Sequence, residues 1–208
     1  ASLARAKLFS HAAFHGSTCL RILYAMNRFS EDLDFALAVP HPAFTWEPYL
    51  SRIQRDCADE GIRVEVQKPA AADATVRKAF VKTDSIARIL SLELPFGRDR
   101  ARTTRIKLEV DTNPPSAATI ETKFITFPVT TAITCMDLAS GFASKCHALL
   151  CREYTKGRDW YDFLWYASRK VTPNLALLAH ALDQQGPWAG QQVTPTTRWL
   201  LDALRARI

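Results

Sequence analysis

The pattern of apolar residues changes character near residue 130, and this change constrains the fold more than any other feature. Before it, short segments that alternate between apolar and polar residues are interleaved with segments of helical spacing, and Asp32–Val39 is the clearest alternating one. From Met136 onward the periodic segments all have helical spacing. We therefore expect an α+β fold, with a mixed β-sheet flanked by helices in residues 1–130 and a helical part in residues 131–208.

The same patterns predict individual elements. Strands are expected at Ala13–Phe14, Asp32–Val39, Arg63–Gln67, Phe80–Ser85, Arg88–Leu94, Arg105–Asp111 and Glu121–Phe127, with a helical turn as the alternative for Arg88–Leu94. Helices are expected at Ala4–His11, Thr18–Tyr24, Trp46–Glu60, Met136–Cys151, Arg158–Ser168, Asn174–Gln184 and Thr196–Arg207. Pro128–Thr134 is expected to be the connection between the two parts. In the helix at 158–168, the buried stripe should comprise Trp160, Phe163, Leu164 and Ala167, with Asp159 and Asp162 on another face.

Composition limits the kinds of partner. Lys and Arg number 27 against 21 Asp and Glu, and the resulting charge of +6 permits a polyanionic partner without identifying one. No run approaches the roughly 18 apolar residues that cross a bilayer, so no membrane partner is expected. The first eleven residues contain no apolar signal segment, and the five cysteines are odd in number with no CxxC pair. A cytoplasmic protein without disulfides or a zinc site is the expectation.

Two carboxylates and a small turn are candidates for an active site. Asp32 and Asp34 are separated by one residue on a predicted strand, so they share a face with Cα atoms roughly 6 to 7 Å apart. Such a pair suits Mg²⁺, which prefers oxygen ligands and commonly binds through one or two carboxylates plus substrate phosphates. Gly16-Ser17, just before a predicted helix, offers backbone N–H groups to a phosphate. Together these features indicate phosphoryl or nucleotidyl transfer, although a solvated strand end would explain the aspartates alone.

A further acidic element strengthens this interpretation. Glu109 and Asp111 project from one face of the second clear strand, Arg105–Asp111. Three carboxylates on neighbouring strands repel one another unless a cation lies between them. Glu109 or Asp111 is therefore the candidate third ligand.

Five segments then resemble one known family, the AbiEii/AbiGii-type nucleotidyltransferase toxins of the DNA polymerase β-like superfamily. The resemblance begins with Phe14-His15-Gly16-Ser17 and with Arg28-Phe29-Ser30-Glu31-Asp32-Leu33-Asp34. It continues in Ile106–Asp111, in the segment from Met136-Asp137-Leu138 to Lys145–Arg152, and in Gly157-Arg158-Asp159-Trp160-Tyr161-Asp162-Phe163. The motifs follow the family order and span residues 14–163. His15 departs from the pattern, since Lys or Arg often stands there.

The resemblance implies a role for each matching position. Gly16, Ser17 and Thr18 should bind nucleotide phosphates, with help from Arg28 and Ser30. Asp32 and Asp34 should bind Mg²⁺, with Glu109 as the third carboxylate and Asp111 as its support or replacement. Lys145 should meet the triphosphate, and Asp159 should orient Lys145 or touch the nucleotide. Without the resemblance, Lys145 reads as a solvated lysine, Ser30 as a turn or cap residue, and Asp159 and Asp162 as surface partners of Arg158 and Arg169.

Two classes of function follow. The resemblance implies an enzyme that transfers NMP from an NTP to an acceptor, in a toxin–antitoxin or phage-defence pair with a cognate antitoxin. A tRNA or other RNA 3′ end is the first acceptor, and a protein hydroxyl is the second. The alternative is a binding module whose metal site is degenerate.

Overall fold

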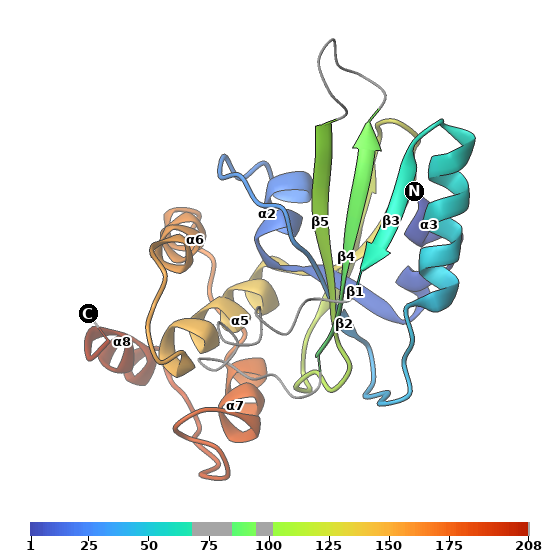
Figure 1. Ribbon diagram of the computed structural model, residues 1–208. Coiled ribbons are helices and arrows are strands. Elements are labelled where there is room, and N and C mark those ends of the chain that lie inside the picture. Colours follow the sequence, from blue (N-terminus) through green and yellow to red (C-terminus); the bar gives the residue numbers. More distant parts are fainter. Residues whose placement is uncertain (68–84, 95–101, 208) are drawn as a thin grey trace. The chain divides into compact units, whose positions relative to one another are not determined.

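The computed structural model describes residues 1–67, 85–94 and 102–207 (Figure 1). The described chain divides into two compact units. The first contains residues 1–67, 85–94, 102–114 and 122–135, and the second contains residues 115–121 and 136–207. The expected α+β class, a mixed sheet followed by helices, is confirmed.

A mixed sheet of seven strands forms the centre of the first unit. The strands are β1 (Ala12–His15), β2 (Leu33–Leu37), β3 (Arg63–Gln67), β4 (Ser85–Leu94), β5 (Arg102–Asp111), β6 (Ile120–Ile125) and β7 (Thr131–Met136). Their order is β3-β4-β5-β2-β1-β7-β6. The pairs β1–β2, β3–β4 and β4–β5 are antiparallel, whereas β1–β7 and β2–β5 are parallel. The two strands that carry the predicted carboxylates, β2 and β5, are therefore direct neighbours.

Alternation along β2 and β5 places apolar side chains on one face of the sheet. Phe35 is 2% exposed, and Leu108 and Val110 are completely buried. Trp46 packs edge-on against Phe35 at 6.0 Å between ring centroids, and its indole N–H donates to the carbonyl of Ile86 at 2.9 Å. This apolar face fixes the register, because a slip of one residue would move the whole apolar set to the other face.

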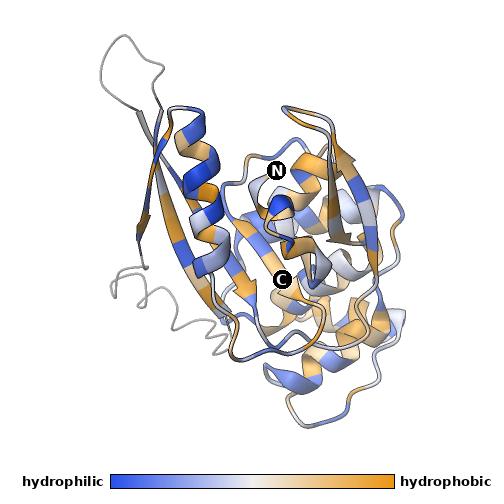
Figure 2. Ribbon diagram, turned by 90° about the vertical axis from the view of Figure 1, so that its right-hand side faces the viewer, coloured by the Kyte–Doolittle hydropathy of each residue, from blue (hydrophilic) through white to orange (hydrophobic). Residues whose placement is uncertain are grey.

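Four helical segments accompany the sheet in the first unit: α1 (Ser2–Arg5), the 3₁₀ turn η1 (Leu8–Ser10), α2 (Gly16–Tyr24) and α3 (Glu47–Asp59). α3 buries Tyr49, Leu50 and Ile53. The mixture of hydrophobic and hydrophilic positions in its ribbon is visible in Figure 2. The single helix predicted at Ala4–His11 is wrong, because Lys7 adopts a left-handed conformation (φ 62°) that separates α1 from η1.

The second unit is helical after its first residues. It contains α5 (Leu138–Cys151), α6 (Gly157–Ser168), α7 (Leu175–Gln184) and α8 (Thr197–Arg205). Side-chain caps begin three of them: Asp137 accepts from the Ser140 N–H, Asn174 from the Leu177 N–H, and Thr196 from the Trp199 N–H. These caps satisfy donors that the first helical turn leaves unpaired.

Three further predictions concern the connection between the two parts, the buried stripe of α6 and the strand at Phe80–Ser85. Pro128–Thr134 is only partly a connection, because β7 starts at Thr131. The buried stripe predicted for α6 is wrong: Leu164 is 64% exposed, and the buried residues are Asp159, Asp162, Trp165 and Tyr166. In the strand predicted at Phe80–Ser85, residues 80–84 lie outside the described residues.

Candidate functional site

Gly16 joins β1 to α2 at a point where a side chain would not fit. Its φ is +78°, a conformation that residues other than glycine rarely adopt. A Cβ atom on Gly16 would lie 2.5 Å from Oδ2 of Asp34. His15, the preceding residue, is the antiparallel partner of Asp34 across β1 and β2. The turn predicted to bind phosphate therefore lies directly against one of the predicted metal ligands.

Asp34 and Glu109 are side by side on the sheet. The parallel register of β2 and β5 pairs Leu33 with Leu108 and Asp34 with Glu109. Because register partners share a face, the leucines point to the core while the two carboxylates point to the opposite face. Asp32 precedes β2 by one residue and stands two positions before Asp34. We call Asp32, Asp34 and Glu109 the acidic group.

A lysine to which the sequence patterns assigned no role accompanies the acidic group. Lys107 stands two residues before Glu109 on β5, and its Nζ lies 2.5 Å from Oε2 of Glu109. Burial alone would lower the pKa of Lys107. The hydrogen bond to Glu109 and the charges of Glu109, Asp32 and Asp34 outweigh burial and raise the pKa. The alternation of Arg105–Asp111 already placed Lys107 on the carboxylate face, and that was the available signal.

Asp111 stands one strand repeat beyond Glu109 and is only 6% exposed. Its register partner on β2 is Ala36, and its Oδ1 accepts a hydrogen bond from the backbone N–H of Asn113 at 3.2 Å. Glu109 rather than Asp111 is thus the acidic residue level with Asp34. The register favours Glu109 as the third carboxylate.

The donors of the acidic group fit a hard divalent cation in chemistry and register. All are carboxylate oxygens, which Mg²⁺ prefers, and the missing Cβ of Gly16 leaves room beside Oδ2 of Asp34. They are not fully assembled, however. Within residues 1–67, 85–94 and 102–207, no three Asp, Glu, His or Cys side chains are gathered closely enough to hold a metal ion.

The other predicted phosphate-binding residues lie in α2 and in the segment before β2. Ser17 is in the first turn of α2. Thr18 is 5% exposed, and its Oγ1 has no hydrogen-bond partner among the described atoms. Arg28 donates to the carbonyl of Phe29 at 3.0 Å. Ser30 lies in irregular backbone where no helix begins, so reading it as a helix cap is wrong.

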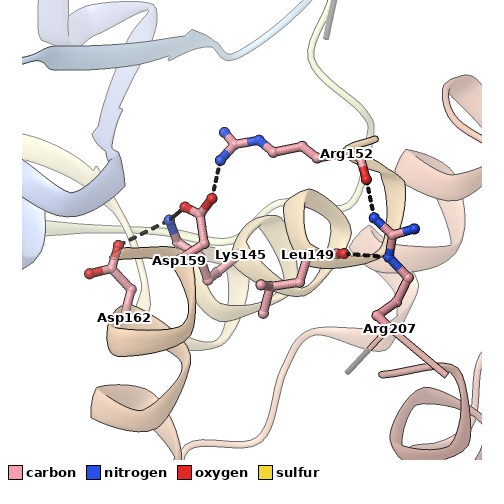
Figure 3. A network of polar contacts seen from close by, with 6 residues as sticks. All are labelled: Lys145, Leu149, Arg152, Asp159, Asp162 and Arg207. Carbon is pink, nitrogen blue, oxygen red and sulfur yellow. Dashed lines mark hydrogen bonds and ion pairs between the residues drawn. The ribbon is translucent and has the colours of Figure 1, made fainter. Parts of the chain in front are cut away.

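A network of buried charges joins α5 to α6 in the second unit (Figure 3). Nζ of Lys145 lies 2.8 Å from Oδ1 of Asp159 and 2.9 Å from Oδ2 of Asp162. The guanidinium of Arg152 binds the second oxygen of Asp159. The side chains of Asp159 and Asp162 are 3% and 0% exposed, so reading them as surface partners of Arg158 and Arg169 is wrong.

Charge balance explains how these carboxylates remain buried. Burial alone would raise the pKa of Asp159, but the charges and hydrogen bonds of Lys145 and Arg152 outweigh it and lower the pKa. Two cations thus face two anions. Lys145, whose side chain is 14% exposed, keeps a fixed position with some access from solvent. Asp159 thus contacts Lys145, and its role in orienting that lysine stays a prediction.

Arg207 holds the end of α5 beside this network (Figure 3). Its Nε donates to the carbonyl of Leu149 at 3.3 Å, and its Nη2 donates to the carbonyls of Arg152 and Glu153. The carbonyls of Leu149 and Arg152 are among the unpaired acceptors that a helix leaves at its C-terminus. Arg207 therefore fixes the backbone that carries Arg152, a contact between distant residues that no local pattern signals.

A family model matches the sequence of both units. It is described as the nucleotidyl transferase AbiEii toxin of type IV toxin–antitoxin systems, and it matches residues 1–207. The chain belongs to the AbiEii family. The general reaction class of this AbiEii protein, nucleotidyl transfer, and its toxin–antitoxin context follow from that membership.

Solved structures agree at the level of the fold. One is a Helicobacter pylori protein assigned as a nucleotidyltransferase, with TM-score 0.51 and 17% identity, covering 99% of this chain and 90% of that one. Another is JHP933 from Helicobacter pylori, with TM-score 0.50 and 18% identity, covering 99% of this chain and 87% of that one. The AbiEii chain thus has the fold of these proteins. No curated protein matches it in sequence.

One general property of the helices remains. None of those in the described ranges of the AbiEii chain is both long and apolar enough to cross a membrane.

Proposed function

We propose that this AbiEii protein is a Mg²⁺-dependent nucleotidyltransferase that moves NMP from an NTP to an RNA 3′ end, with tRNA as the first candidate, and releases pyrophosphate. The observation that supports it best is the register that sets Asp34 beside Glu109, against the Gly16 turn. Carboxylates beside a turn that can bind phosphate are the equipment of this chemistry.

Each residue has a task in this proposal. Backbone N–H groups of Gly16 and Ser17 at the start of α2 bind the phosphates, where the helix dipole favours negative charge. Thr18, Arg28 and Ser30 support that contact. Asp32 and Asp34, with Glu109 as the third carboxylate, hold Mg²⁺, and the bound ion supplies positive charge next to the phosphates. Lys145 adds a fixed positive charge for the triphosphate, held in place by Asp159.

The proposed reaction is a single displacement at phosphorus. The hydroxyl oxygen of the acceptor attacks the α-phosphorus of the NTP, and the bond from that phosphorus to the pyrophosphate oxygen breaks. In this proposal Glu109, which lies beside Asp34 in the register, would accept the proton of the attacking hydroxyl. Residues 1–130 supply the carboxylates, and residues 131–208 complete the active site with Lys145.

The choice of RNA rests on charge. The net charge of +6 favours a polyanionic acceptor, because neutralised phosphates supply most non-specific affinity for nucleic acids. We propose a cytoplasmic enzyme that acts in phage defence. Membership of a type IV toxin–antitoxin family also implies a cognate antitoxin protein as partner.

Transfer of label from each of four α-³²P-labelled NTPs to total tRNA tests the proposal. The wild type and Asp202→Asn, which changes an exposed carboxylate on α8, should label RNA when Mg²⁺ is present. Asp34→Asn should lower labelling by at least about a hundredfold, in the range expected when a group that stabilises the transition state is lost. Label on protein instead of RNA would favour a protein acceptor. Absence of label with all four NTPs would favour a binding module.

A further inference from the structure

The ammonium group of Lys107 binds Glu109, one of the carboxylates that the proposed function assigns to a metal. It lies 2.5 Å from Glu109, and its side chain is 37% exposed. Asp32 and Asp34 are close enough for their charges to act on it. The group therefore combines three negative charges with one positive charge on the same face of β2 and β5.

Two cations cannot use the same Glu109 oxygen without conflict. A divalent cation at the acidic group attracts the carboxylates, as the ammonium does, but it repels the ammonium. The ammonium occupies Oε2 of Glu109, so a metal that used this oxygen would first have to displace it, and a metal on Oε1 would still be repelled by the nearby ammonium. The contact with Lys107 thus opposes the recruitment of Glu109 to a metal at Asp34.

We propose that Lys107 is an internal competitor of the divalent cation: its ammonium holds Glu109 before the metal binds and weakens metal binding at Asp32, Asp34 and Glu109. This inference rests on the proposed function, since it requires the acidic group to be a metal site. Lys107 is a positioning residue, because it acts through Glu109 and not on the substrate.

Direct binding of Mn²⁺ to the full chain without nucleotide tests the inference. The electron paramagnetic resonance signal of free Mn²⁺ gives the dissociation constant without any measurement of activity. Lys107→Gln removes the ammonium and should lower the dissociation constant about tenfold, because a repulsion at close range is removed. Lys107→Arg keeps the charge and should bind Mn²⁺ within about twofold of the wild type.

Arg105→Gln is the matched control. Arg105 stands two residues before Lys107 on the same strand and face, so the variant makes the same change in net charge further from Glu109. It should change the dissociation constant less than about twofold, because exposed charges are screened by salt. An equal gain in Arg105→Gln and Lys107→Gln would overturn the inference, since net charge alone would then explain both.

Further outcomes separate the inference from the proposed function. Folding of each variant is checked by circular dichroism, and Lys107→Met replaces Lys107→Gln if the latter does not fold. Unchanged or weaker Mn²⁺ binding in a folded Lys107→Gln or Lys107→Met variant overturns the inference alone, provided that Asp34→Asn abolishes the binding seen in the wild type. If Asp34→Asn binds Mn²⁺ as the wild type does, or the wild type does not bind it, the metal site itself is wrong.

Discussion

Gly16 shows how a single backbone conformation can decide the chemistry around it. We expect Gly16→Ala to lower the free energy of unfolding by at least about 1–2 kcal/mol, the cost of a left-handed non-glycine residue. Its new Cβ would also displace the Asp34 carboxylate, so Mn²⁺ binding and RNA labelling should be lost. Urea denaturation measures the loss of stability. The Mn²⁺-binding assay and the RNA-labelling assay measure the effects on the site.

Gly61→Ala is the control for Gly16→Ala. Gly61 has a φ of +72°, close to that of Gly16, but nothing lies within 4 Å of the position its Cβ would take. It should show the same loss of stability with Mn²⁺ binding intact. Retention of Mn²⁺ binding in Gly16→Ala would contradict the close contact with Asp34.

Asp159 should give the stability a recognisable dependence on pH. Because its pKa is lower in the native state than in the unfolded chain, its contribution is complete above the ordinary aspartate pKa of about 3.9 and is lost as the pH falls through the native value. Asp159→Asn should therefore be less stable than the wild type at pH 7, with a smaller decrease of stability between about pH 5 and pH 3. Urea denaturation over this range measures it.

Asp202→Asn is the control for Asp159→Asn, because this aspartate is 51% exposed and pairs with Arg198 and Arg205 on the surface. The stability of Asp202→Asn should depend on pH in the same way as that of the wild type. An Asp159→Asn variant with the wild-type slope would show that the buried network does not lower the native pKa.

Some contacts between individual side chains could be predicted from the sequence, and others could not. Strand alternation and motif order together pointed to the face of Asp34 and Glu109, and the structure sets these two side by side. The ammonium of Lys107 on Glu109 and the guanidinium of Arg152 on Asp159 were not predicted. Alternation shows which face a side chain takes but not which neighbour it binds, since that depends on side-chain conformation and on contacts between distant segments.

At the scale of whole elements, α6 is the clearest case in which local pattern misleads. Its apolar stripe suggested that Leu164 lies inside, but the charged network turns Asp159 and Asp162 inward instead. Lys145 on α5 and Arg152, which directly follows this helix, neutralise the two buried carboxylates. The pattern of α6 alone contains no information about these partners. β7 was likewise missed, because the segment Pro128–Thr134 was interpreted as the connection between the two parts.

The packing of α5 on α6 depends on Gly141. A Cβ at this position would collide with the hydroxyl of Tyr166, whose ring is stacked on Phe142 at 4.8 Å and cannot easily move. Gly141→Ala should therefore cost about 1–3 kcal/mol of stability by overpacking, although alanine is the better helix former by about 1 kcal/mol. Thermal and urea denaturation measure the net change in the free energy of unfolding.

Gly157→Ala provides the matched comparison on α6, because nothing lies within 4 Å of the position that its Cβ would take. We expect a change within about 0.5 kcal/mol, as for ordinary surface substitutions. A stabilised Gly141→Ala would mean that α5 and α6 are less closely packed than the structure shows.

At the scale of the whole molecule, the chain should behave as a protein of five unreactive thiols. Cys19, Cys135 and Cys146 are buried, and Cys57 and Cys151 are half-buried. Burial raises the pKa of Cys146 and of Cys151 to about 12, so their thiolates are scarce at pH 8. Iodoacetamide should modify the native protein slowly, and it should add five groups after denaturation without reductant, as intact mass spectrometry can show.

Cys57→Ser is the control for native labelling. This thiol is half-buried and near Asp56 and Glu60, which together with burial raise its pKa. Any slow native modification that Cys57→Ser removes belongs to this residue. Fewer than five groups on the denatured wild type would reveal a disulfide and would contradict the free thiols of the structure.

The order of the strands sets the moment during synthesis at which the carboxylates can meet. β1 is synthesised early, but one of its neighbours in the sheet is β7, which ends at Met136. Likewise, Asp34 on β2 can pair with Glu109 only after β5 has been synthesised. Closing such long loops comes late in folding, because their entropy must be overcome before the contacts form. On the proposed function, a nascent chain that stops before β5 contains Gly16 and Asp34 but lacks Glu109, so it should not transfer NMP.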